Sequence, residues 1–225
     1  KGIVEEAGAG REIRSILGDE SLRFFYSPYL RAKQTLEEII REGFADHPAD
    51  CVLAREEVLL REQDFGNLQD PEKMLRCKSE RAEFGRFYYR WPCGESGSDV
   101  YSRVQSFHSS LRRMMDANDS LQIENYILIS HGLTIRLYLM RILRWTVEQF
   151  ERVLNPKNGQ IVVLEKFVDD EMGTSYRIAE STMLRHGKHG KRLPEEYLKG
   201  PVRQPSELHE SMPFVRTLSQ LSIDK

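Results

Sequence analysis

Three segments of the sequence carry residue types that bind anions or transfer protons. The first is SPYLRAKQT at residues 27–35, where Arg31 falls in the first turn of an expected helix. The free N–H groups of a helix N-terminus already favour an anion, and a positive charge there is unfavourable for the helix itself. An arginine at this point is better explained by a carboxylate or phosphate held by its planar guanidinium group. The alternative is an exposed helix arginine with no ligand.

The second segment is Ser130-His131-Gly132, which lies between an apolar run and an apolar helical pattern. An imidazole at this point can donate a hydrogen bond to a phosphoryl oxygen, and the glycine lets the backbone approach a ligand. A histidine buried in the core with a protein partner is the competing explanation.

The third segment is LREQDFG at residues 60–66, which contains Glu62. On its own, Glu62 is more simply explained as a surface charge.

The elements that must position these residues follow from the spacing of apolar side chains. The pattern predicts helices at about residues 3–17, 30–40, 71–89, 96–114, 133–143 and 147–153, and strands at about 22–26, 51–53, 126–130, 160–167 and 175–180. Alternating strands and helices predict an α/β fold with a mainly parallel sheet. Ligands of open α/β sheets bind beyond the carboxyl ends of the strands, which is where Arg31 and His131 fall.

Length and composition limit the alternatives. The 225 residues, 40% of them hydrophobic, suffice for one sizeable core, which we expect at residues 1–182, followed by a polar, proline-containing tail at 183–225. With 33 basic and 35 acidic residues the net charge is −2, which predicts neither a nucleic-acid nor a membrane-surface partner. No apolar run approaches the roughly 18 residues of a membrane span. Three cysteines without CxxC spacing suggest neither disulfides nor a zinc site, and favour a reducing, cytoplasmic compartment.

Together with GESGSDVYSRV at residues 94–104, the three segments resemble the histidine phosphatase superfamily, the phosphoglycerate-mutase-like proteins. The resemblance covers about residues 1–180 and implies a three-layer sandwich with a mainly parallel sheet flanked by helices. It implies that Arg31 is a phosphate-pocket arginine, that His131 is the second pocket histidine, and that Glu62 protonates the leaving oxygen. The run at residues 84–92 resembles the phosphatase-type branch, and Arg86, Arg90 and Gly132 are expected to bind substrate. No cofactor or metal is expected, and a homodimer is left open.

The family's nucleophile is a histidine in an Arg-His-Gly triplet that ends the first strand, upstream of the first helix. This chain starts at the helix, so we expect the nucleophile upstream of it and the chain alone to be inactive. The missing strand would pair with the strand at 126–130, so its absence would leave an open edge and a groove. Arg185-His186-Gly187 repeats the triplet after the last expected strand. We interpret it as part of a solvated basic run, with nuclear targeting or anion binding as alternatives.

The sequence thus supports two classes of function. The first is a phosphomonoester phosphatase that acts on a phosphorylated substrate through a phosphohistidine, with a phosphoglycerate mutase as a variant of the same chemistry. The second is a non-catalytic member of the same fold that binds a phosphate ligand or a protein.

Overall fold

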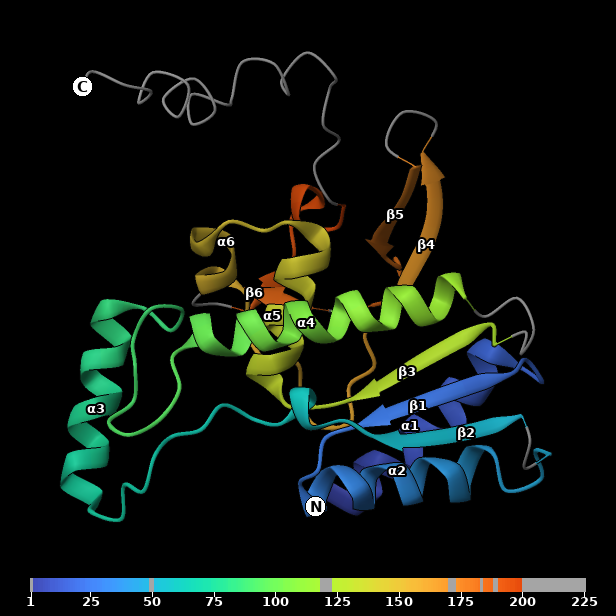
Figure 1. Cartoon of the computed structure of the whole chain (residues 1–225), viewed down its shortest axis with the longest axis horizontal. Helices are drawn as coiled ribbons and strands as arrows, with labels where there is room; N and C mark the ends of the chain where they lie inside the picture. The colour runs from blue at the N-terminus through green and yellow to red at the C-terminus, as the bar shows by residue number, and fades with distance from the viewer. Residues whose placement is uncertain are drawn as a thin grey trace, which may run out of the picture.

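The computed structural model describes residues 2–48, 51–117, 123–169, 173–182, 184–187 and 190–199 (Figure 1). The helices are α1 (Gly2–Leu17), α2 (Leu30–Gly43), α3 (Pro71–Phe84), α4 (Gly97–Asp116), α5 (Gly132–Leu143) and α6 (Val147–Arg152), with the short 3₁₀ turns η1 (Val58–Leu60) and η3 (Glu195–Tyr197). The strands are β1 (Leu22–Tyr26), β2 (Val52–Glu56), β3 (Asn125–Ile129), β4 (Leu164–Asp169), β5 (Gly173–Ile178), β6 (Arg185–His186) and β7 (Lys191–Arg192).

The central sheet is parallel and has the order β2-β1-β3. Phe24 of β1 pairs with Ala54 of β2 on one side and with Ile127 of β3 on the other. Among the described residues β3 pairs only with β1, while β4 and β5 pair with each other in a separate antiparallel hairpin. The predicted parallel α/β fold is confirmed, because the strands that carry the site all run in one direction.

Helices cover both faces of this sheet. Leu22 and Phe24 of β1 pack with α1 and α2, whereas Phe25, which points to the opposite face, packs with α4 and α5. Figure 1 accordingly shows α2 and α4 on opposite sides of the strands. α4 begins at a capping box, in which Ser96 accepts from the backbone N–H of Asp99 and the Asp99 carboxylate accepts from that of Ser96. α4 therefore starts at a defined point next to the loop that carries Glu62.

Two segments differ from the sequence expectation. α3 ends at Phe84 and not near residue 89, because Gly85 has φ +99° and turns the chain, after which Phe87 is buried in the main core. Leu184, Leu193 and Tyr197, beyond the expected start of the tail at residue 183, are also buried in that core. Leu184 and Leu193 flank the two-residue strands β6 and β7, and Tyr197 ends the short turn η3. Elements this short leave no periodic pattern in the sequence. Residues 200–225 of the expected tail lie outside the described residues.

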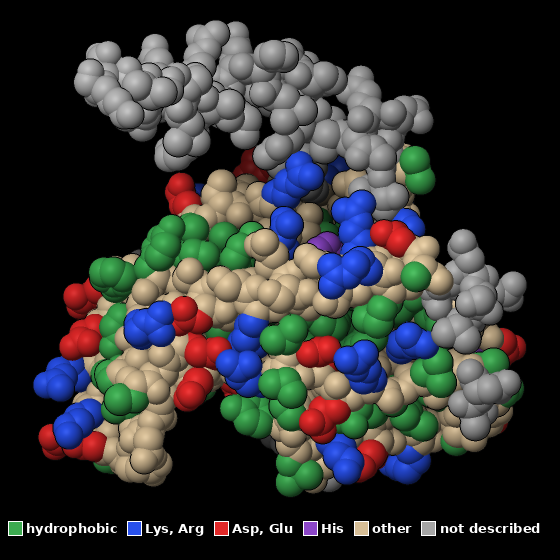
Figure 2. All heavy atoms as spheres, in the orientation of Figure 1, with side chains coloured by type: hydrophobic (Ala, Val, Ile, Leu, Met, Phe, Trp, Pro, Cys, Tyr) green, Lys and Arg blue, Asp and Glu red, His purple; other side chains and the backbone are tan. Residues whose placement is uncertain are grey.

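Charged side chains are interspersed over most of the face shown in Figure 2, which is hollowed between α3 and the lobe formed by α1 and α2. None of the described helices combines the length and the apolar character needed to cross a membrane.

Candidate active site

The three residues singled out from the sequence meet beyond the carboxyl ends of β1 and β3. Arg31 comes from the first turn of α2, His131 is the N-cap of α5, and Glu62 follows η1. Arg31 Nη2 lies 3.0 Å from His131 Nδ1 and also donates to the Glu62 carboxylate. Glu62 Oε2 is in turn 3.9 Å from His131 Nδ1. An arginine, an imidazole and a carboxylate from three separate elements therefore share one small volume.

His131 is oriented from its other side by Ser27, whose Oγ lies 2.7 Å from His131 Nε2. A guanidinium can only donate, so Nδ1 accepts from Arg31, and the ring proton then resides on Nε2 and is donated to Ser27 Oγ. Tyr29 packs edge-on against the imidazole at 5.1 Å between ring centroids. The Arg31 guanidinium lies 4.7 Å from the centre of the same tyrosine ring. Ser27 and Tyr29 thus fix the positions of both pocket residues.

His131 is a neutral base in the folded protein. Its exposed fraction is only 7%, and burial lowers its pKa to about 4, with the charges of Arg31 and Arg103 acting in the same direction. A bound anion would oppose these effects, because a negative charge favours the protonated imidazole. Glu62 supplies one negative charge near Arg31 and His131. One further negative charge would balance Arg31 together with a protonated His131.

The loop that carries Glu62 is fixed by polar side chains from α4 and from the end of β3. Arg103 of α4 donates to the carbonyl oxygens of Leu59, at 2.6 Å, and of Glu62, at 3.2 Å. Ser130 Oγ donates to the Leu60 carbonyl at 2.7 Å. Each of these bonds ends on a backbone oxygen, so Arg103 and Ser130 constrain the main chain of the loop directly.

Glu95 neutralises Arg103 and extends the same network. Its carboxylate accepts from Arg103 Nε at 3.1 Å, from Arg61 Nη2 at 2.5 Å and from the backbone N–H of Asp64 at 3.0 Å. Glu95 and Arg103 lie in the segment at residues 94–104, but the sequence analysis predicts no role for either residue. The signal that could have identified them is a charged pair at a spacing of eight residues across the start of a helix, flanked by glycine and serine.

Two glycines let the Glu62 loop pack backbone-to-backbone against the loop before α4. Gly66 has φ +68°, and a Cβ there would lie 2.1 Å from the Pro92 carbonyl oxygen. A Cβ at Gly94 would lie 2.5 Å from the Asp64 carbonyl oxygen. No real side chain tolerates such distances, so both positions require glycine if the loop is to keep its path.

The residues expected to bind substrate are placed differently. A Cβ at Gly132 would lie 2.8 Å from the side-chain nitrogen of Asn155, so this glycine serves a close contact within the protein. Arg90 pairs with Asp99 at 2.7 Å, and Arg86 donates to the Glu151 carbonyl at 3.3 Å. Within the described ranges no hydrogen bond or ion pair joins Arg86 or Arg90 to the Arg31 cluster. Their substrate-binding roles stay predictions.

The Arg-His-Gly triplet at residues 185–187 is not part of the Arg31 cluster. Arg185 and His186 form β6, which pairs with β7, and the His186 ring stacks on Tyr197 at 6.0 Å between centroids. In the part of the chain that the structure describes, no group of three or more His, Cys, Asp or Glu side chains is arranged to hold a metal ion.

Comparison with known proteins agrees with this geometry. The chain is 41% identical over 175 residues to the phosphoglycerate mutase-like protein AT74 of Arabidopsis thaliana, covering 73% of this chain and 54% of that protein. It is 38% identical over 200 residues to AT74H of the same plant, covering 83% and 70% of the two chains. It is 39% identical over 133 residues to the broad-range acid phosphatase DET1 of Saccharomyces cerevisiae, covering 57% and 39%. The chain thus spans about half the length of the first of these relatives.

Solved structures show the same fold. A protein described as mycobacterial hydrolase 1 superposes with a TM-score of 0.62 at 16% identity, covering 79% of this chain and 83% of the other. The mycobacterial glucosyl-3-phosphoglycerate phosphatase superposes with a TM-score of 0.58 at 18% identity, covering 79% and 84%. The family model of the histidine phosphatase superfamily, branch 1, matches residues 2–173, which include every residue of the Arg31 cluster. The chain therefore belongs to the histidine phosphatase superfamily.

Proposed function

We propose that this chain carries the phosphate pocket and the general acid of a phosphomonoester phosphatase that works through a phosphohistidine. The observation that supports this proposal best is the convergence of Arg31, His131 and Glu62, with Arg31 Nη2 3.0 Å from His131 Nδ1. Phosphoryl transfer requires positive donors for the phosphoryl oxygens and an acid for the departing alkoxide. The description of the yeast relative as a broad-range acid phosphatase supports hydrolysis in preference to mutase chemistry.

Each residue has a role in this reaction. Arg31 donates to two phosphoryl oxygens once Glu62 has moved from it to the leaving oxygen. His131 takes up a proton as the dianion binds and donates to a third oxygen. A second imidazole attacks phosphorus, the bond between phosphorus and the leaving oxygen breaks, and protonated Glu62 gives its proton to that oxygen. Water then attacks the phosphohistidine, which releases phosphate and restores the imidazole.

The attacking imidazole is the part that the Arg31 cluster does not supply. Among the described histidines, only His131 contacts Arg31 or Glu62. We propose that the nucleophile belongs to a strand that precedes residue 1 and pairs with β3 along the edge that β1 leaves open. The pairing of β3 with β1 alone, within the described residues, supports this place for it. On this proposal we expect no hydrolysis by the 225-residue chain alone.

The competing function is a non-catalytic protein that binds a phosphorylated ligand, and the same lack of a second imidazole among the described contacts favours it. The two are separated by comparing hydrolysis of p-nitrophenyl phosphate by the 225-residue chain and by a protein extended with the residues encoded upstream. We expect hydrolysis and an acid-labile phosphohistidine only in the extended protein. Hydrolysis by the 225-residue chain would refute an upstream nucleophile. An extended protein that binds phosphate without turnover would favour the non-catalytic function.

In the extended protein, Arg31→Gln should abolish hydrolysis, whereas Arg41→Gln should not. Arg41 lies in the last turn of the same helix, pairs with Glu38 and has a largely exposed side chain. Loss of activity in both variants would point to damage to α2 and would remove the support for a specific role of Arg31.

A further inference from the structure

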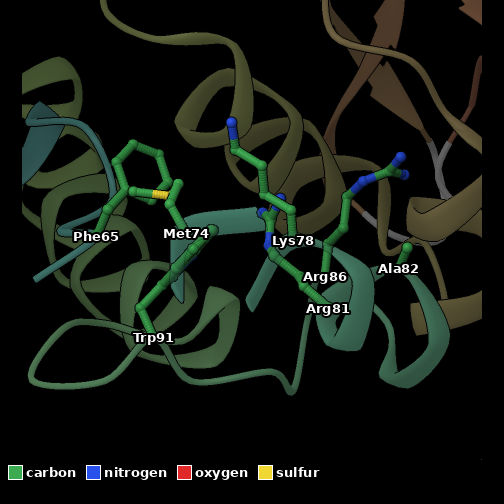
Figure 3. A pocket seen from close by; sticks show the side chains of 7 residues that line it. All are labelled: Phe65, Met74, Lys78, Arg81, Ala82, Arg86 and Trp91. Atoms are coloured by element: carbon green, nitrogen blue, oxygen red, sulfur yellow. The ribbon is translucent and has the colours of Figure 1, made fainter. Parts of the chain in front are cut away.

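A second basic feature lies apart from the Arg31 cluster. A pocket of about 520 Å³ is lined by α3 and by the segments that carry Phe65, Arg86 and Trp91. Figure 3 shows the aromatic rings of Phe65 and Trp91 on one side of it and Arg86 on the other, with Lys78 and Arg81 of α3 between them. Its volume is within the range of small-molecule binding sites, which is roughly 300–1,000 Å³. The wall thus combines an apolar half with three cationic side chains.

The cations around this pocket outnumber their carboxylate partners. Burial and the charge of Arg86 both lower the pKa of Arg81, and Glu151 is the one carboxylate that opposes them. Behind the pocket wall, burial and Arg86 lower the pKa of Arg136 to about 9, again with Glu151 as the one opposing carboxylate. Within the described residues Arg136 donates to two uncharged oxygens, those of Phe150 and Asn155. An anion in the pocket would relieve this repulsion.

Two of the residues that line the pocket each have a buried donor nitrogen without an acceptor in the part of the chain that the structure describes. Trp91 has an exposed fraction of 2%, and its indole Nε1 has no hydrogen-bond partner within the described ranges. Arg81 Nε also has no hydrogen-bond partner within the described ranges, although Arg81 Nη2 donates to Gln63 Oε1 at 3.2 Å. Neither nitrogen is solvent-accessible, so a ligand in the pocket would meet these residues through the Trp91 ring and the terminal guanidinium nitrogens of Arg81.

We propose that this pocket binds an organic anion, a phosphate or carboxylate group joined to an apolar or aromatic body, at a site separate from the phosphate held by Arg31 and His131. The anionic group pairs with Lys78, Arg81 and Arg86, while the body packs against Phe65 and Trp91. The rings of Phe65 and Trp91 already meet edge-to-face at 5.1 Å, so they form a preformed apolar wall. Phe65 belongs to the loop that carries Glu62, so a ligand in the pocket would contact the loop of the general acid. Arg81 also donates to Gln63, the residue that follows Glu62 in this loop.

The two tryptophans make the proposal testable without any activity. In a nitrogen-15 NMR spectrum the chain should give two indole signals, one from Trp91 and one from Trp145, which is buried and donates to the Tyr197 carbonyl at 2.9 Å. Trp91→Phe assigns the signals. Titration with phenyl phosphate should shift the Trp91 signal to saturation and leave the Trp145 signal in place. Phenol, which has the ring without the charge, should produce no saturable shift. No saturable shift with phenyl phosphate would overturn the proposal.

Four variants define the site. Arg81→Gln and Lys78→Gln should each weaken phenyl phosphate binding by about tenfold, because each removes a charge-assisted hydrogen bond. Arg76→Gln removes the same charge from an exposed position on α3, where Arg76 does not line the pocket, and should change nothing. Arg31→Ala should leave the Trp91 titration intact. If Arg31→Ala abolishes the shift, or if Arg76→Gln weakens binding as much as Lys78→Gln, the proposed separate site is wrong.

These outcomes are independent of the proposed phosphatase activity. If the extended protein does not hydrolyse phosphomonoesters, the expected result of the Trp91 titration does not change. If Arg81→Gln prevents folding because Gln63 loses its partner, Lys78→Gln still decides the matter, since the Lys78 side chain has no hydrogen bond or ion pair within the described ranges.

Discussion

Arg31 and Glu62 are bound to each other through the guanidinium nitrogen, Nη2, that also lies 3.0 Å from His131 Nδ1. The arginine that is placed to hold a phosphate is therefore already occupied by a carboxylate of the same chain. The Arg31 side chain is more than half exposed, so this ion pair adds little to stability. Its consequence is for binding, because an incoming phosphate competes with Glu62 for the same donor.

Replacement of Arg31 by Gln should weaken phosphate binding to the 225-residue chain by at least about tenfold, because it removes the charged donors of the pocket. Isothermal titration calorimetry with inorganic phosphate measures this change. Arg41→Gln is the matched control on the same helix. Equal affinity of the Arg31→Gln variant and the unmodified chain would exclude Arg31 from the phosphate pocket.

Replacement of Glu62 by Gln should have the opposite effect on binding. The neutral amide competes less well for Arg31 and removes a negative charge near the incoming dianion, so phosphate affinity should rise several-fold. In an extended protein that has the nucleophile, the same change should lower the turnover of substrates with poor leaving groups. Glu37→Gln, on the α2 surface, controls for the change in net charge. Weaker phosphate binding in Glu62→Gln would show that the Arg31–Glu62 pair is not a competitor.

The strands and the types of the pocket residues could be predicted from the sequence, because β1 and β3 are short, bounded apolar runs that end at a polar residue. The positions of the strands and pocket residues relative to each other could not be predicted. Ser27 reaches His131 because the register of the two strands aligns Tyr26 with Ile129, and no local pattern specifies a pairing across 104 residues. The substrate-binding roles predicted for Arg86 and Arg90 rest on resemblance alone, and the structure places each residue beside a protein acceptor.

The Glu62 loop is the other part that the sequence did not specify. Its path is set by Arg103 and Ser130, whose side chains donate to its backbone oxygens from α4 and from the end of β3. Such bonds follow from the packing of distant elements and produce no periodicity. The sequence of residues 58–69 shows no helix or strand periodicity, and in the structure this segment is irregular apart from the short turn η1.

Gly66→Ala tests whether this loop controls the site. Gly18 and Gly66 have almost the same positive φ, +62° and +68°, so alanine should cost about 1 kcal/mol of backbone strain at either position. At Gly18 nothing lies within 4 Å of the added Cβ, whereas at Gly66 it would meet the Pro92 carbonyl oxygen at 2.1 Å. Gly66→Ala should therefore lower stability further in urea unfolding and should alter phosphate affinity, while Gly18→Ala leaves that affinity unchanged. Equal effects of the two substitutions would mean that the loop contact with Pro92 is dispensable.

The pH dependence of stability should report His131. Its pKa of about 4 in the folded chain lies below the ordinary value of 6.5, so between these values the unfolded chain binds a proton that the folded chain does not. Stability should thus be intact above pH 6.5 and should fall as the pH falls toward 4. One such group contributes a slope of at most about 1.4 kcal/mol per pH unit. His108 contributes in the same direction, because burial also lowers its pKa, so the two must be separated.

Urea unfolding of His131→Asn and His108→Asn over this pH range makes the separation. Each variant should lose part of the slope of the unmodified chain, and the double variant should lose both parts, since the two sites do not contact each other within the described residues. Phosphate should then distinguish them. Because a bound anion favours protonated His131, phosphate should flatten the remaining slope in His108→Asn and leave that of His131→Asn unchanged. A slope that His131→Asn does not reduce would mean that folding does not lower the pKa of His131, and that its imidazole is not held as a neutral acceptor for Arg31.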